Sequence, residues 1–324
     1  MLYSSILSIF ALAAAGANAH GYVAWIVADG KKYVGGVPGE THPDSPIRSI
    51  STINPYKDPK GPGQTCGLNA KAGKLTATVT AGSTLDLSWA EHKQQAWPHE
   101  LGPLITYMAK VPAGKTAATV DPATLDFFKI QQTGQKTKGG LKWFVEDQMK
   151  LNTKYSVKVP LNLADGDYMM RHEIIALHLA DKKGGAEFYA SCFQLKVTGG
   201  TGSGSPGPTA KFPGAYSATD KGIFTPGVFD KGFNYQFPGP ALFSGASNLT
   251  TPSAPKPAAP ITPDPTDDDD EEDCEEEPET TSIRTSTKTA TSKRSMPTGD
   301  MHNGYKRSAW SRRMEKRYVG RASN

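Results

Sequence analysis

The sequence has little cysteine and, after its first 19 residues, no apolar run long enough to cross a bilayer. The missing run excludes a transmembrane helix, and the basic, polar C-terminus excludes a lipid-anchor signal, so we expect no membrane partner. The three cysteines are Cys66, Cys192 and Cys274. In an oxidising compartment this odd number predicts one disulfide and one remaining thiol. We expect Cys66 and Cys192 to pair, because both lie in globular-looking sequence.

Internal repeats, extended helical periodicity and a convincing pair of catalytic carboxylates are also absent. The missing carboxylate pair disfavours a glycosidase. Apolar residues instead recur mostly at every second position, between frequent glycines and prolines. Alternation of this kind, in short runs joined by long loops, is typical of an all-β protein built as an antiparallel sandwich.

The alternation locates several of the expected elements. It predicts a hairpin over 75–89, a strand over 155–159, and two long paired strands over 166–180 and 187–198. A Lys-Lys-Gly-Gly link joins the two long strands. A short helix is expected over 121–129, where an Asp-Pro pair supplies an N-cap and a first-turn proline.

Residues 1–19 have the features of a secretory signal peptide. They are apolar and uncharged in the middle and end in Ala-Asn-Ala, a small-x-small cleavage pattern. Cleavage there makes His20 the first residue of a secreted, extracellular protein. Its free amine, with a reference pKa near 8, and its Nδ1 could then chelate Cu(II). If cleavage lies elsewhere, His20 is an ordinary residue near the terminus.

The composition divides the rest of the chain into a globular domain over 20–243 and a tail over 244–324. The tail is rich in Pro, Ser and Thr, with ten acidic residues over 267–277 and then eleven Lys and Arg over 281–324, which predicts disorder. A solvated tail balanced by its own acidic block is favoured over one that binds nucleic acid, so we expect no nucleic-acid partner. Asn248 begins a glycosylation sequon.

Strand parity places several chemically active side chains near one another. Glu187 and Tyr189 are two residues apart and share a face, and His172 and His178 share a side of the neighbouring strand. Pairing of these strands brings His178 toward Glu187 and Tyr189, while Cys192 leaves toward a disulfide. The His/Glu/Tyr group has the ligand types of a metal site. The alternative is a set of hydrogen-bonded core residues.

Several ordered segments carry a family resemblance. They are His20–Val23, Trp97–Pro103, Ile105–Ala109, Arg171–His178, Phe188–Cys192, Phe212–Tyr216 and Phe237–Phe243. Together they resemble the fungal cellulose-active lytic polysaccharide monooxygenases of auxiliary-activity family nine, formerly glycoside hydrolase family sixty-one. The resemblance covers residues 20–243. It implies an immunoglobulin-like antiparallel β-sandwich, with long loops and short helical segments, that holds one copper ion on a flat face.

The resemblance also implies roles for single residues. Copper would be held by the amine and Nδ1 of His20 and by a ring nitrogen of His99, with Tyr189 as a distant axial oxygen. His178 and Glu187 would lie beside the metal. The family usually has Gln where this chain has Glu187, and an ionised carboxylate accepts hydrogen bonds but donates none.

The same resemblance implies the disulfide Cys66–Cys192, while Lys110-Val111 stands where many members have a cysteine of a second disulfide. His92, in a polar stretch, and His172, at a position variable in the family, are less favoured ligands than His99. Tyr216 and, more weakly, Tyr22 are the expected substrate-facing rings. The alternative is that both rings pack against the sandwich. No cysteine-rich cellulose-binding module follows the domain.

These observations predict a secreted, monomeric, copper-dependent monooxygenase that cleaves β-1,4-glucan chains by hydroxylation at C1, C4 or both. Cellulose is the expected substrate, with hemicellulose as a second possibility. The reaction would use an external electron donor and dioxygen or hydrogen peroxide. Two alternatives remain on the same fold. A copper-binding or delivery protein would release no oxidised sugars, and a carbohydrate-binding protein would bind polysaccharide equally well without copper.

Overall fold

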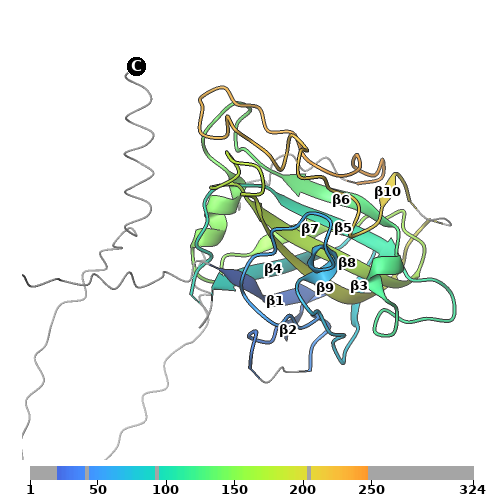
Figure 1. The fold of residues 1–324 in the computed structure, drawn as a ribbon. Helices are drawn as coiled ribbons and strands as arrows, with labels where there is room; N and C mark the ends of the chain where they lie inside the picture. Colours follow the sequence, from blue (N-terminus) through green and yellow to red (C-terminus); the bar gives the residue numbers. More distant parts are fainter. Residues whose placement is uncertain (1–19, 41–43, 92–94, 203–205, 247–324) are drawn as a thin grey trace, which may run out of the picture. The chain divides into compact units, whose positions relative to one another are not determined.

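The part of the chain that the structure describes is built around two β-sheets (Figure 1). In this computed structural model those residues are 20–40, 44–91, 95–202 and 206–246. The smaller sheet has the order β2-β1-β4-β7, and the larger has the order β10-β6-β5-β8-β9-β3. The predicted all-β sandwich is therefore confirmed. Within the described residues, no helix has the length and apolar character needed to span a membrane.

The smaller sheet is antiparallel throughout. Its strands are β1 (Gly21–Ala28), β2 (Lys31–Val34), β4 (Thr84–Glu91) and β7 (Tyr155–Lys158). The larger sheet contains β3 (Ala77–Thr80), β5 (Leu104–Lys110), β6 (Phe127–Thr133), β8 (Gly166–Ala176), β9 (Glu187–Thr198) and β10 (Thr209–Ala210). Its neighbours pair antiparallel except for β3, which runs parallel to β9. The helical segments are short: α1 (Gly63–Cys66) and the 3₁₀ turns η2 (Pro122–Thr124) and η3 (Phe144–Met149).

Alternating side chains of β4 form part of the core between the sheets. Leu85, Leu87 and Trp89 point inward and are almost completely buried. β8 and β9 are buried over nearly their whole length, because loops cover the face that the other sheet leaves open. Their antiparallel pairing confirms the two long strands predicted between residues 166 and 198. β8 is shorter than expected and ends at Ala176, so that His178 lies in the loop between β8 and β9.

Two predicted elements were wrong. The expected hairpin over 75–89 does not form, because β3 and β4 lie in different sheets and the turn between them carries the chain across the sandwich. Alternation shows that one side of each run is buried, but it does not show which strand pairs with which. The expected helix over 121–129 is only the turn η2, capped by Asp121, since β6 begins at Phe127 and draws the following residues into the larger sheet.

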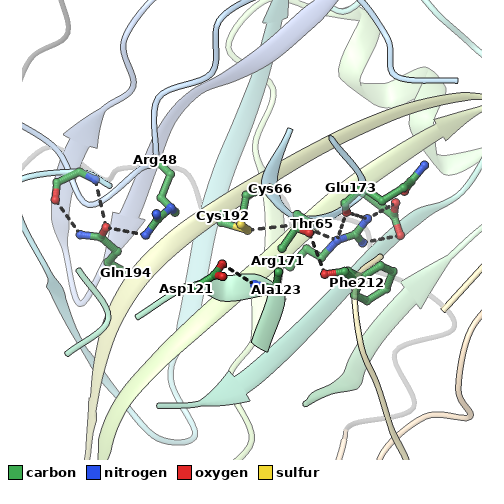
Figure 2. The surroundings of a disulfide bond; sticks show 12 residues. Arg48, Thr65, Cys66, Asp121, Ala123, Arg171, Glu173, Cys192, Gln194 and Phe212 are labelled. Atoms are coloured by element: carbon green, nitrogen blue, oxygen red, sulfur yellow. Dashed lines mark hydrogen bonds and ion pairs between the residues drawn. A yellow bond between two sulfur atoms is a disulfide. The ribbon is translucent and has the colours of Figure 1, made fainter. Parts of the chain in front are cut away.

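A buried polar cluster holds the loop that contains Tyr216 against the larger sheet. Arg171 and Glu173 on β8 form a fully buried ion pair at 2.7 Å, which Figure 2 shows beside the disulfide. Tyr216 donates a hydrogen bond to Glu173, and the hydroxyls of Tyr216 and Tyr107 lie 2.7 Å apart. A buried charge pair needs such additional hydrogen bonds to offset its desolvation. Tyr216 is therefore part of the interior.

Candidate metal centre

His20 immediately precedes β1, whose first residue must be small for local packing. A Cβ atom at Gly21 would lie 2.5 Å from the carbonyl oxygen of Ala90 and 2.9 Å from Cε3 of Trp97. The glycine thus allows the backbone beside His20 to lie closely against β4 and Trp97. The Nδ1 atom of His20 is buried and has no hydrogen-bond partner among the described residues. A buried nitrogen in this condition fits a metal ligand, because metal coordination would compensate its lost hydration.

The loop before β5 carries His99. Leu101 in this loop accepts a hydrogen bond from Leu177, at 2.9 Å, as β8 ends. Gly102 has φ = +140°, and a Cβ there would lie 1.9 Å from the carbonyl oxygen of Ile175. Only glycine tolerates both the backbone conformation and this approach. The backbone around His99 is thus fixed against the end of the larger sheet.

The side chain of His99 lies within an aromatic group. Its Nε2 is 3.2 Å from the hydroxyl of Tyr189. The ring of Trp97 meets the His99 ring edge-on at 5.4 Å and the Tyr189 ring at 4.8 Å between centroids. The ring of His20 lies 6.5 Å from that of Tyr189. Trp97 therefore forms an apolar wall against which the two predicted metal-binding rings, His99 and Tyr189, are oriented.

His178 and Glu187 complete the cluster. The ring of His178 stacks on that of His99, with 4.3 Å between centroids and 13° between planes. Oε2 of Glu187 accepts a hydrogen bond of 2.9 Å from Tyr189 and lies 3.6 Å from Nε2 of His178 and 3.7 Å from Nε2 of His99. One ligand atom each from His99, His178 and Glu187 falls within 4.8 Å of the others, a spacing compatible with a metal ion. The predicted convergence of His178, Glu187 and Tyr189 is found.

Burial dominates the electrostatics of these side chains. It lowers the pKa of His20 and of His178, an effect that Glu187 opposes and Lys57 reinforces. Burial and the carboxylate of Glu187 raise the pKa of Tyr189. At neutral pH the two imidazoles are therefore neutral, the form that binds metal ions, and Tyr189 keeps its proton. A protonated phenol is a weak ligand, so Tyr189 would bind a metal ion less strongly than the imidazoles would.

One residue of this cluster was not found by sequence reasoning. Nζ of Lys57 lies 3.3 Å from Oε1 of Glu187. Lys57 lies in an irregular loop, far from the other site residues in the sequence, and no motif marks it. The backbone pairing of its neighbour Tyr56 with Phe188 brings it to the site.

Two predicted site residues and one of the less favoured histidines are buried in the interior. Tyr216 is 2% exposed and Tyr22 is 3% exposed, so the expectation that these rings present a stacking surface to a sugar was wrong. Both rings are covered by neighbouring parts of the chain. His172 is fully buried and lies 2.8 Å from the hydroxyl of Thr106. It faces the core and does not join His178.

The expected disulfide is present, with Cys66 of α1 bonded to Cys192 of β9 (Figure 2). It joins segments separated by 126 positions. His92, the sequon at Asn248, Cys274 and residues 1–19 lie outside the described residues.

The donor set fits a copper ion. It combines neutral imidazole nitrogens with the amine that His20 would supply as a terminal residue, and nitrogen ligands are those that Cu(II) prefers. The buried Nδ1 of His20, without a partner among the described residues, is the structural sign of this fit. Nε2 of His99 faces the same cluster.

Comparison with known sequences and structures gives consistent matches. The family described as "Auxiliary Activity family 9 (formerly GH61)" matches residues 20–232. A protein of Gloeophyllum trabeum named AA9 family lytic polysaccharide monooxygenase D is 44% identical over 235 residues, which are 72% of this chain and 66% of that protein, just under two thirds of its length.

Solved structures match over a similar region. The extended catalytic domain of LPMO9A from H. jecorina superposes with a TM-score of 0.63 at 33% identity, over 72% of this chain and 94% of that one. A cellulose-active polysaccharide monooxygenase from M. thermophila gives a TM-score of 0.60 at 30% identity, over 70% of this chain and 100% of that one.

Proposed function

Because the chain belongs to Auxiliary Activity family 9, a family of polysaccharide-cleaving monooxygenases, we propose that it is a copper-dependent enzyme that oxidatively cleaves β-1,4-glucan. The observation that carries the copper assignment is the buried Nδ1 of His20, which lacks a partner among the described residues. Cellulose is the favoured substrate, since a related solved structure is named as cellulose-active.

In this proposal, His20 holds copper through its amine and Nδ1, and His99 holds it through Nε2. Bound copper would supply the one-electron chemistry of oxygen activation, which side chains alone do not provide. The hydroxyl of Tyr189 keeps its proton and donates it in the hydrogen bond to Glu187. The Trp97 wall excludes water from one side of the ligands and fixes their orientation.

Further features follow from the family and the sequence. The enzyme would be secreted after removal of residues 1–19, since only cleavage there frees the amine of His20. An external electron donor and dioxygen or hydrogen peroxide would complete the reaction, with hydroxylation at C1, C4 or both. Residues 20–243 would form the catalytic domain of a monomer, and 244–324 would form a tail with no direct part in catalysis.

The copper assignment is tested by altering the amine. A protein with one additional residue before His20 should bind Cu(II) orders of magnitude more weakly, because a peptide nitrogen replaces the free amine of the chelate. Isothermal titration calorimetry of the native and extended proteins measures this difference. Equal affinities would exclude a chelate formed by the chain terminus.

The activity is tested on insoluble cellulose with a reductant and the copper-loaded protein. Mass spectrometry should detect soluble oligosaccharides that carry an added oxygen at C1 or C4, and the His99→Ala variant should yield none. Copper binding without oxidised products would indicate a copper-binding or delivery protein instead. Polysaccharide binding that is unaffected by copper removal, again without products, would indicate a carbohydrate-binding protein.

A further inference from the structure

The position of Lys57 is set by backbone pairing with the strand that carries the site. The amide of Tyr56 donates a hydrogen bond of 2.9 Å to the carbonyl of Phe188, and the amide of Phe188 donates one of 2.8 Å to the carbonyl of Tyr56. The bridge is antiparallel. One step along each segment, residue 57 lies beside residue 187. The two backbone hydrogen bonds between Tyr56 and Phe188 therefore place Lys57 next to Glu187.

The loop around Lys57 is closely packed. A Cβ atom at Gly61 would lie 2.0 Å from the Tyr56 hydroxyl, and one at Gly63 would lie 2.5 Å from Cδ2 of the same ring. The carboxylate of Asp58 accepts a hydrogen bond from the amide of Lys60 at 2.9 Å. These contacts limit movement of the backbone from which the Lys57 side chain extends toward the site.

The two carboxylate oxygens of Glu187 have different partners. Oε1 lies 3.3 Å from Nζ of Lys57, and Oε2 accepts the 2.9 Å hydrogen bond from Tyr189. The Glu187 side chain is only 6% exposed, whereas that of Lys57 is 50% exposed. Removal of one partner of a buried carboxylate leaves a poorly compensated charge that seeks a new counter-charge.

A metal ion would offer such a counter-charge. One oxygen of Glu187 and one ring nitrogen each of His99 and His178 lie within 4.8 Å of one another, a spacing compatible with a shared metal ion. Carboxylate oxygens bind divalent cations readily. An amide at this position would carry no charge and would compete less strongly as a ligand. The carboxylate of Glu187 is therefore a potential additional ligand beside His99.

The structure assigns to Lys57 the role of a positioning residue that holds Glu187 as a hydrogen-bond acceptor and keeps its carboxylate from coordinating the metal. This inference rests on the proposed copper function of the site. It explains how a buried acid is held beside the predicted metal ligands, since Lys57 supplies the opposite charge from the loop that Tyr56 anchors to β9.

The test is the Cu(II) electron paramagnetic resonance spectrum of five variants and the parent. Lys57→Met should change the copper hyperfine coupling, because the released carboxylate enters the coordination sphere. Lys57→Arg keeps the charge and should reproduce the parent spectrum. Lys57→Met combined with Glu187→Gln should give the same spectrum as Glu187→Gln alone, since an amide supplies no anionic ligand.

Three results would overturn the assignment. These are an unchanged spectrum in both Lys57→Met and Lys57→Gln, a Lys57→Met change that persists in the Glu187→Gln background, or a Lys57→Arg spectrum like that of Lys57→Met. Calorimetry separates this failure from failure of the proposed function. A parent protein that does not bind one equivalent of copper overturns both, whereas normal copper binding with unchanged variant spectra overturns only the role of Lys57.

Discussion

At the residue scale, three buried histidines differ in chemical role because their neighbours differ. His99 and His178 lie in a cluster with a carboxylate and a phenol. His172 lies between the sheets with Thr106 and the rings of Trp89 and Tyr155. Burial first, and then the charge of Arg171, lower the pKa of His172 to about 3. His172 is thus neutral in the native state above about pH 3.

This burial predicts acid-sensitive stability. Between pH 6.5 and 3 the unfolded chain protonates His172 and the native state does not, so the unfolded state binds more protons and stability falls as the pH falls. From pH 6.5 to pH 4 the loss is on the order of 3 kcal/mol. Urea unfolding across this range should show a shallower pH dependence for His172→Gln. Parallel curves for the two proteins would contradict the prediction.

The burial of Tyr216 predicts a stability effect and no direct effect on substrate binding. Tyr216→Phe removes the hydroxyl that donates to Glu173 and leaves a buried carboxylate with one fewer partner. The expected cost is about 1–3 kcal/mol in the free energy of unfolding. Denaturant titration measures this cost, and a pull-down with insoluble cellulose measures binding. Weaker binding at unchanged stability would restore the substrate-facing role.

At the scale of elements, the long strands β8 and β9 hold the site in place, and a disulfide links β9 to α1. Sequence pattern was sufficient to predict β7, which has one buried face, and the long strands β8 and β9, which are buried over nearly their whole length. It was insufficient for β3 and β4, which alternate equally well but pair with partners in different sheets. The local sequence pattern shows which face of a strand is buried. The partner of each strand depends on how all the strands pack in the sandwich.

At this scale, the Cys66–Cys192 disulfide is expected to contribute strongly to the free energy of unfolding. Cys66→Ala combined with Cys192→Ala frees α1 from β9 and opens a loop of 126 positions. The expected loss is roughly 2–5 kcal/mol, because the unfolded chain regains conformational freedom. Thermal unfolding of the double variant and of the parent, compared under reducing and non-reducing conditions, measures it. If reduction lowers the melting temperature of the double variant as much as that of the parent, the effect has another source.

At the scale of the whole molecule, composition predicts that the catalytic domain is self-sufficient. The described core ends before the acidic and basic blocks, and the family match ends at residue 232. A chain that ends after Ala246 should keep its melting temperature and its copper affinity, since the removed segment lacks the apolar periodicity of a folded unit. Differential scanning calorimetry and copper titration measure both. A loss of several degrees would contradict the proposed division at residue 243.

The sequence by itself determined the all-β class, the Cys66–Cys192 bridge, and the grouping of His178, Glu187 and Tyr189. These features follow from alternation, cysteine placement and ordered motifs, which are properties of short segments. Only the tertiary structure showed that Lys57 meets Glu187, that Tyr216 is buried, and that β3 and β4 separate. Each of these depends on contacts between segments far apart in the chain. Such contacts are fixed by strand pairing and loop packing, which no local pattern encodes.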